Sequence, residues 1–152
     1  MPGISRALVQ DYFQACVSRD PARIAAYLDD DIEWSCTGPV DLLHFCGHRR
    51  GKRAALDNIV RLAPSVIELT RIDLEEVLID GDCAATFTRL SATHVRTGRN
   101  VSYRCAQFLR FRNNKLVEFR GLMDSFDAVE QVLGHPIELP PAQTRADNVV
   151  AI

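Results

Sequence analysis

The stretch Arg99 to Gly134, RNVSYRCAQFLRFRNNKLVEFRGLMDSFDAVEQVLG, decides the fold, and it predicts two strands, a tight turn and a short helix. The first arm alternates by residue, and its mostly apolar face carries Val101, Tyr103, Cys105, Gln107, Leu109 and Phe111. Segregation with a period of two is typical of an antiparallel strand that has a core or pocket on one side and water on the other. Gln107 is the polar exception on the apolar face.

The residues before this stretch predict helices followed by a meander of strands. Apolar residues recur every three or four positions in 4–17, and Asp20 and Pro21 begin a second helix over 21–28. The chain is then expected to form a strand over 32–37, a helix over 52–63 and strands over 66–79 and 83–95. Ser125 is expected to cap a last helix over 126–133. Helices segregated before hairpin-connected strands favour an α+β fold.

Length, composition and charge narrow the class of protein. The chain has 152 residues, 47% of them hydrophobic, which suits one domain, expected over 1–134. A net charge of -2 disfavours nucleic acid and anionic membrane surfaces as partners. We find no apolar run of about 18 residues and no signal-peptide core, and five scattered cysteines suit a reducing compartment. We therefore expect a cytoplasmic protein with no membrane partner.

Two segments are predicted to be irregular. Residues 38–50, GPVDLLHFCGHRR, combine glycine and proline with bulky apolar side chains, which suits a lid over a site. His44 or His48 in this lid is a candidate acid or base, or else a solvated loop residue. Together with Cys46 they match no zinc spacing, so no metal site is predicted. The proline-containing tail 135–152 is expected to form an extended arm on the surface or on a partner subunit.

The order of elements, with LVQDYFQACVSRDPARIAAYLDDDIEW at the front and FLRFRNNKLVEFRGLMDSFDAVEQVLG at the back, resembles the nuclear transport factor 2-like superfamily. The resemblance covers about residues 5–134 and is nearest to the SnoaL-like and ketosteroid-isomerase-like branch. It implies a cone, in which a curved antiparallel sheet surrounds a deep apolar pocket, often with a homodimer formed through the sheet. Because this cone serves isomerases, cyclases, epoxide hydrolases and non-enzymatic domains, the fold alone does not name the function.

The resemblance also implies roles for single residues. Tyr12 matches the tyrosine with which ketosteroid isomerases stabilise an enolate, and Gln107 falls where they have a protonated aspartic acid as second donor. An amide can serve there, because it donates hydrogen bonds at any pH. Cys36 occupies the position of their general base, and the lack of a carboxylate there disfavours steroid isomerisation.

Other candidates have a structural alternative. Asp124 is nearest to the acidic residue of SnoaL-like cyclases, but an aspartate beside a helix start is more often a cap. Gly121 stands where an epoxide-hydrolase carboxylate would be expected. Trp34, Cys36, Tyr103 and Cys105 are expected to line the pocket, the aromatic ones as stacking surfaces or as core. A nucleophilic Cys36 would need a base, so a packed thiol is favoured.

The arginines of the last two strands form either a basic patch or cross-strand pairs. Arg104, Arg110, Arg112 and Arg120 lie on strands near the carboxylates Glu75, Glu76 and Glu118, which favours pairing. Altogether the sequence predicts a small protein that binds a compact, mostly apolar or aromatic molecule. It would work without a cofactor, and proton-transfer chemistry on the ligand (isomerisation, cyclisation or dehydration) is one alternative. A non-catalytic module for ligands or partner proteins is the other.

Overall fold

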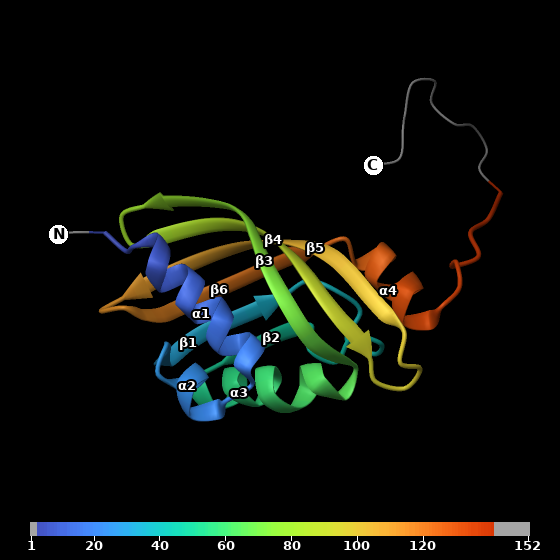
Figure 1. Ribbon diagram of the computed structural model, residues 1–152, viewed down its shortest axis with the longest axis horizontal. Helices are drawn as coiled ribbons and strands as arrows, with labels where there is room; N and C mark the ends of the chain where they lie inside the picture. Colours follow the sequence, from blue (N-terminus) through green and yellow to red (C-terminus); the bar gives the residue numbers. More distant parts are fainter. Residues whose placement is uncertain (1–2, 142–152) are drawn as a thin grey trace, which may run out of the picture.

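The computed structural model describes residues 3–141 of the chain, which form one curved six-stranded sheet with helices against it (Figure 1). The strands lie in the order β2-β1-β6-β5-β4-β3. Their bounds are β1 Leu28–Cys36, β2 Gly47–Arg50, β3 Ile67–Asp80, β4 Cys83–His94, β5 Asn100–Arg112 and β6 Lys115–Met123. The helices are α1 Arg6–Ser18, α2 Pro21–Ala25, α3 Lys52–Asp57 and α4 Ser125–Leu133. The predicted α+β cone is thus present.

Most strand pairs are antiparallel hairpins, but one pair is parallel. The expected sheet was antiparallel throughout, whereas β1 runs parallel to β6, with Trp34 opposite Phe119 and Cys36 opposite Gly121. Parallel neighbours need a long connection, and here the chain between them passes through β2, α3 and the strands β3, β4 and β5. The predicted alternation of β5 is confirmed, since its odd-numbered residues are buried from Val101 to Phe111.

Helix α1 closes the concave side of the sheet. Ser5 caps it by accepting a hydrogen bond from the Leu8 amide at 3.1 Å, and Arg19 ends it in the left-handed conformation at φ 57°. Its buried face carries Val9, Tyr12, Phe13, Ala15 and Cys16. Figure 1 shows α1 lying across the strands, with α2 and α3 near its end and α4 beside the beginning of β5. The main core therefore lies between α1 and the sheet.

Several element boundaries differ from the sequence prediction. The second helix ends at Ala25, because a turn at Ala26 and Tyr27 leads directly into β1, whose first residue Leu28 pairs with Leu116 and is fully buried. The expected loop 38–50 contains the edge strand β2, which pairs with β1. The expected helix 52–63 is regular only to Asp57 and continues as a π-helical turn (Asn58–Leu62) and a 3₁₀ turn (Ala63–Ser65).

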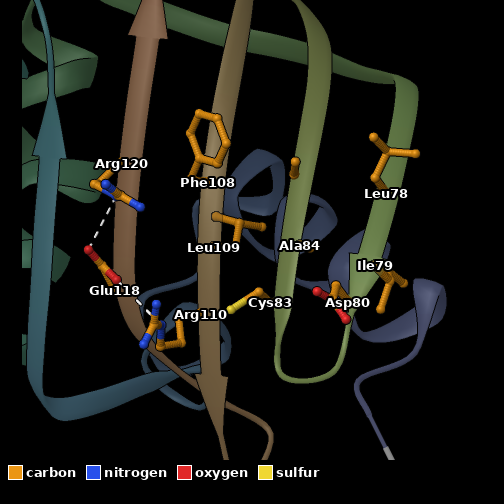
Figure 2. A pocket seen from close by; sticks show the side chains of 11 residues that line it. Leu78, Ile79, Asp80, Cys83, Ala84, Phe108, Leu109, Arg110, Glu118 and Arg120 are labelled. Carbon is orange, nitrogen blue, oxygen red and sulfur yellow. Dashed lines mark ion pairs between the residues drawn. The ribbon is translucent and has the colours of Figure 1, made fainter.

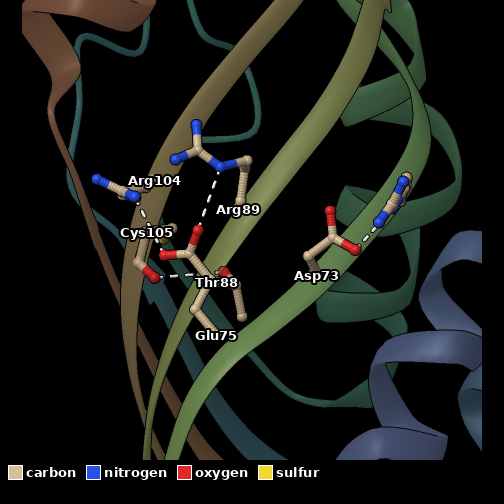
Figure 3. Close-up of polar contacts among 7 residues, drawn as sticks. Asp73, Glu75, Thr88, Arg89, Arg104 and Cys105 are labelled. Atoms are coloured by element: carbon tan, nitrogen blue, oxygen red, sulfur yellow. Dashed lines mark hydrogen bonds and ion pairs between the residues drawn. The ribbon is translucent and has the colours of Figure 1, made fainter.

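The outer face of the sheet carries cross-strand ion pairs. Glu75 on β3 lies 3.2 Å from Arg89 on β4 and 3.0 Å from Arg104 on β5 (Figure 3). Glu118 on β6 pairs with Arg110 on the neighbouring strand β5 and with Arg120 two residues along its own strand. Each carboxylate thus pairs with two arginines, and ion pairing across the strands is what the sequence favoured. Arg112 pairs instead with Asp29 of β1, at 3.2 Å.

The C-terminal segment is described in part. Residues 135–141 form no helix or strand, and the Ile137 amide donates to the Glu130 side chain at 2.7 Å. The rest of the predicted arm, 142–152, lies outside the described residues. Within 3–141, no helix is long and apolar enough to cross a membrane.

Candidate functional site

A cavity of about 130 Å³ lies between α1 and the concave face of the sheet. Side chains from α1, β1, β3, β4, β5, β6 and the π-helical turn line it. The polar or polarisable members are Tyr12, Cys16, Arg19, Trp34, Cys36, Asn58, Tyr103, Cys105, Gln107 and Met123. An engineered apolar cavity of similar size, about 150 Å³, accommodates benzene. The volume therefore suits a ligand with a single ring.

Tyr12 reaches the cavity from α1 and is 1% exposed. Burial raises the pKa of its hydroxyl well above the ordinary value, and the neighbouring Cys16 thiol adds to this effect. Burial likewise raises the pKa of Cys16 to about 12. At neutral pH the tyrosine is therefore an uncharged phenol, which can donate a hydrogen bond into the cavity.

Gln107 lies on β5 and is held by two threonines of β4. The Thr86 hydroxyl donates to Gln107 Oε1 at 2.7 Å, and Gln107 Nε2 donates to Thr88 Oγ1 at 2.8 Å. Thr88 in turn donates its only proton to the Cys105 carbonyl at 3.2 Å (Figure 3). Because Thr88 can then only accept from Gln107, the amide orientation is fixed. The Gln107 side chain also lies near enough to the Cys105 thiol to oppose the rise in the pKa of that thiol.

The cysteines of the cavity are neutral thiols. The hydrogen bond with Cys46 is the first cause of the raised pKa of Cys36, and burial adds to it. Burial raises the pKa of Cys105 to about 12 and also raises the pKa of Tyr103. A thiol of this kind neither attacks as a thiolate nor accepts a proton at neutral pH. Cys36, at the position of the isomerase base, is therefore a wall residue.

Two buried polar atoms in the cavity wall lack partners. Trp34 stacks on Phe119 with ring centroids 5.1 Å apart and an interplanar angle of 2°. Its indole N–H lies near the Tyr12 hydroxyl and slightly opposes the rise in the pKa of Tyr12. The indole N–H nevertheless has no hydrogen-bond acceptor within residues 3–141. Asn58 Oδ1 is also unpartnered. Leaving such an atom unpaired costs about 1–3 kcal/mol.

Three predicted catalytic residues lie away from the cavity lining. Asp124 is exposed and caps α4, because its carboxylate accepts from the Asp127 amide at 3.1 Å, and Ser125 is the first helical residue instead of the cap. His44 and His48 are exposed, and His48 Nε2 lies 2.7 Å from Glu33. The structure therefore brings Tyr12 and Gln107 into one cavity but places these three residues elsewhere.

The loop 38–50 contributes to the site in one place only. Phe45 is buried and lines the cavity, while the Phe45 carbonyl accepts from Asn58 Nδ2 at 3.2 Å. Cys46 is buried whereas the flanking His44 and His48 face solvent, so the three do not converge. Among residues 3–141, no group of three or more His, Cys, Asp or Glu side chains is placed to hold a metal ion.

The sequence analysis did not single out Asn58, Thr86 or Thr88. Asn58 lies three residues after Ala55, on the apolar stripe of the predicted helix 52–63, and a polar residue in such a stripe is a usable signal. The threonines alternate along β4 and face the same side as Ala84. A pair of hydroxyls on a buried strand face indicates a polar partner on the next strand.

A second, shallower hollow of about 250 Å³ lies on the sheet, away from the cavity lining (Figure 2). Leu78, Phe108 and Arg120 line it from neighbouring strands, and Glu118 bridges two arginines at its edge. Leu78 is 70% exposed and Phe108 is 46% exposed. The Arg120 guanidinium lies over the Phe108 ring at 5.5 Å. The hollow therefore combines exposed apolar side chains with fixed charges.

Comparison with solved structures identifies similar folds. A protein from Rhodopseudomonas palustris named as a candidate isomerase is 33% identical, covers 87% of this chain and all of its own, and superposes with a TM-score of 0.79. A Catenulispora acidiphila protein with a ketosteroid isomerase-like fold, solved with trimethylamine, is 12% identical over 91% and 100% of the two chains, with a TM-score of 0.72. An epoxide hydrolase from M. tuberculosis, 16% identical over 84% and 88%, gives 0.68.

The family assignment follows from sequence as well as structure. The family model for the SnoaL-like domain matches residues 9–119, which include Tyr12, Trp34, Asn58 and Gln107 of the cavity. No curated protein matches the sequence. The solved relatives below 25% identity share the fold. The chain therefore belongs to the SnoaL-like domain family of the nuclear transport factor 2-like superfamily.

Proposed function

We propose that this protein binds a compact, uncharged, mostly apolar molecule in its cone, and that Tyr12 and Gln107 donate hydrogen bonds to a carbonyl oxygen of that molecule. The observation that carries the proposal is the neutral lining of the cavity. Tyr12, Tyr103 and the thiols are protonated at neutral pH, and the charged lining residue Arg19 is exposed and paired with Glu68 at 2.7 Å. Burying a charged ligand there would be costly, because it would lack a counter-ion.

Binding is favoured over proton transfer because the described lining contains no carboxylate or imidazole. Abstraction of a proton from carbon needs a base within hydrogen-bond reach of it. Cys36 does not meet this need, since its raised pKa keeps it protonated. The polarising donors alone are enough to orient and retain a carbonyl compound.

The binding test uses the single tryptophan of the chain, Trp34, whose fluorescence reports on the cavity. We expect acetophenone to bind and the similarly sized anion benzoate to bind at least about tenfold more weakly, because the anion loses its hydration without gaining a partner charge. Tyr12→Phe and Gln107→Leu should each weaken acetophenone binding about fivefold, the value of one hydrogen bond. Unchanged affinity in both variants would remove the proposed donor pair.

Proton-transfer chemistry is the second candidate, favoured by the relative from Rhodopseudomonas palustris that is named as a candidate isomerase. Its test is the exchange of the α-protons of cyclohexanone in deuterated water, followed by nuclear magnetic resonance. On the binding proposal the protein does not accelerate this exchange. Acceleration that disappears in Tyr12→Phe would establish catalysis and replace the binding proposal.

We also propose that the hollow on the sheet is covered by a second copy of the chain. Four adjacent strands each expose one large apolar side chain on this face: Leu78, Phe87, Phe108 and Leu122. Arginines and glutamates surround them and provide charges of both signs. Two copies of this face can therefore pair with each other. Light scattering should give the mass of a dimer, and Phe108→Glu should give a monomer. The control is Leu139→Glu, at an exposed leucine outside the sheet, and this variant should remain dimeric. A monomeric parent protein would refute this part.

A reducing compartment such as the cytoplasm suits the proposal. All five cysteines are free, including Cys36 and Cys46, which are hydrogen-bonded neighbours. The Cys36 thiol is part of the neutral cavity wall, and its pairing with Cys46 into a disulfide would change the chemistry of that wall.

A further inference from the structure

We propose that Trp34 and Asn58 form a donor and acceptor pair for the ligand, so that the ligand must carry both a hydrogen-bond acceptor and a hydrogen-bond donor, as a phenol or a hydroxyl-bearing carbonyl compound does. The proposal rests on the binding function above and adds to it a specificity that Tyr12 and Gln107, in their proposed role as donors, do not provide. It concerns Asn58 in particular, which no other argument connects with binding.

The proposal is based on the buried polar side-chain atoms that have no hydrogen-bond partner. Within residues 3–141 there are two such atoms, and both belong to residues that line this one cavity. They are Trp34 Nε1 and Asn58 Oδ1, and the two residues are 6% and 1% exposed. Folded proteins pair nearly all such atoms, so an unpaired one requires an explanation. Two of them lining one cavity indicate an occupant that completes both.

The roles of the two atoms are fixed by their surroundings. An indole N–H can only donate, and the flat stacking of Trp34 on Phe119 keeps the ring from turning toward another acceptor. Asn58 Nδ2 faces the Phe45 carbonyl at 3.2 Å, which can only accept, so the atom left for the cavity is the acceptor Oδ1. The two positions therefore differ in kind, and an occupant must match each.

The backbone at Asn58 supports a binding role. Asn58 is the first residue of the π-helical turn, where the helix that began at Lys52 leaves regular geometry. Such turns are rare and occur often at functional sites. Since the turn carries Asn58 and the next residue, Ile59, into the lining, its irregularity brings a polar and an apolar contact to the same cavity.

The pair also suggests how the ligand lies. Trp34 Nε1 is near the Tyr12 hydroxyl, so one ligand oxygen can accept from both. The ligand hydroxyl or N–H then donates to Asn58 Oδ1, and its apolar body faces Phe45, Phe119 and Ile72. A phenol satisfies both positions with one oxygen when it accepts from Trp34 and donates to Asn58.

The test compares phenol, which donates and accepts, with toluene, which has nearly the same size and does neither. Titration calorimetry should show phenol binding about tenfold more tightly than toluene to the parent protein. Trp34→Phe keeps the stacked ring but lacks the N–H, and Asn58→Leu keeps the volume but lacks the acceptor. Each should reduce the preference for phenol to about threefold or less while leaving the toluene affinity unchanged. The matched control Asn100→Leu replaces an exposed asparagine outside the cavity and should change neither affinity.

The outcomes separate this inference from the binding proposal. If toluene binds and phenol binds no better, the pair is satisfied by water and the inference is wrong, while the cavity proposal stands. If neither probe binds, the cavity proposal fails and the inference fails with it. A preference for phenol that survives in both variants overturns the assignment to Trp34 and Asn58. Should Asn58→Leu not fold, as circular dichroism would show, Trp34→Phe decides the question alone.

Discussion

Replacing Gln107 with leucine tests whether its amide holds the sheet together as well as facing the ligand. Gln107 is 3% exposed, and its Oε1 accepts a hydrogen bond from the Thr86 hydroxyl at 2.7 Å. Gln107→Leu therefore leaves a buried hydroxyl donor without a partner, at a cost of about 1–3 kcal/mol of unfolding free energy. Thr88 is affected less, because it still donates to the Cys105 carbonyl.

The reverse change, Thr86→Val, leaves Gln107 Oε1 unpaired and should cost a similar amount. When both are replaced, no unpaired atom remains between them. The loss of unfolding free energy in the double variant should therefore be about 2 kcal/mol smaller than the sum of the two single losses. Urea unfolding at pH 7 measures all four proteins, and an unchanged dependence on urea confirms that the same surface unfolds.

Thr93→Val provides the matched control, since Thr93 lies farther along β4, opposite Asn100, and should be additive with Gln107→Leu. Additive losses for Thr86→Val and Gln107→Leu, within about 0.5 kcal/mol, would refute the reasoning. They would show that the two side chains do not act as a pair, and that the orientation of the Gln107 amide is not fixed in the way described.

Three further predictions concern a cap, pH and a helix end. Asp124→Ala removes the cap on the Asp127 amide and should lower the unfolding free energy by about 1 kcal/mol. Asp124→Asn should be about as stable as the parent protein, and acetophenone binding should stay close to that of the parent. Loss of acetophenone binding without loss of stability would contradict this role of Asp124. Burial raises the pKa of Cys16 and Cys105 from 9.0 to about 12, so the folded state prefers the neutral thiols, and stability should be constant below pH 9 and fall between pH 9 and 12 by about 1.4 kcal/mol per pH unit for each thiol. Thermal unfolding across this range should show a smaller decline in Cys16→Ala, and an identical decline would be evidence against the assignment. Arg99→Ala removes donors to the carbonyls of Gln131 and Val132 at the end of α4, so hydrogen exchange should show that helix opening more readily, with no change in β4.

The sequence predicted the container well because its local signals agree with the tertiary arrangement. The period of two in β5, the cap at Asp20 before Pro21 and the tight turn between β5 and β6 each specify a conformation within a few residues. The structure has a strand, a helix start and a turn at these three positions, as predicted. Asn113 and Asn114 adopt positive φ values of 51° and 59°, as the turn requires.

The errors occurred where long-range pairing decides the local conformation. Gly47–Arg50 is a strand only because β1 offers it an edge, and Leu28 joins β1 because Leu116 of β6 lies opposite. Leu116 is far from Leu28 in the sequence, and residues 37–46 separate β1 from β2, so no local pattern indicated either pairing. Ser125 was predicted as the cap because serine is a common cap, whereas Asp124, with the longer reach, occupies that position in the structure.

By itself, then, the sequence determined the helices, the strands and the α+β class, since hydrophobic periodicity and turn residues act over short distances along the chain, and its resemblance to a known superfamily indicated the cone. It also placed Tyr12 and Gln107 on inward faces. Only the tertiary structure decided which polar groups meet. It fixed Gln107 between two threonines, left Asp124, His44 and His48 outside the cavity, and brought Trp34 and Asn58 to it with one unpaired atom each. The reason is physical: the partner of a buried polar atom is set by three-dimensional packing, which a pattern along the chain does not record.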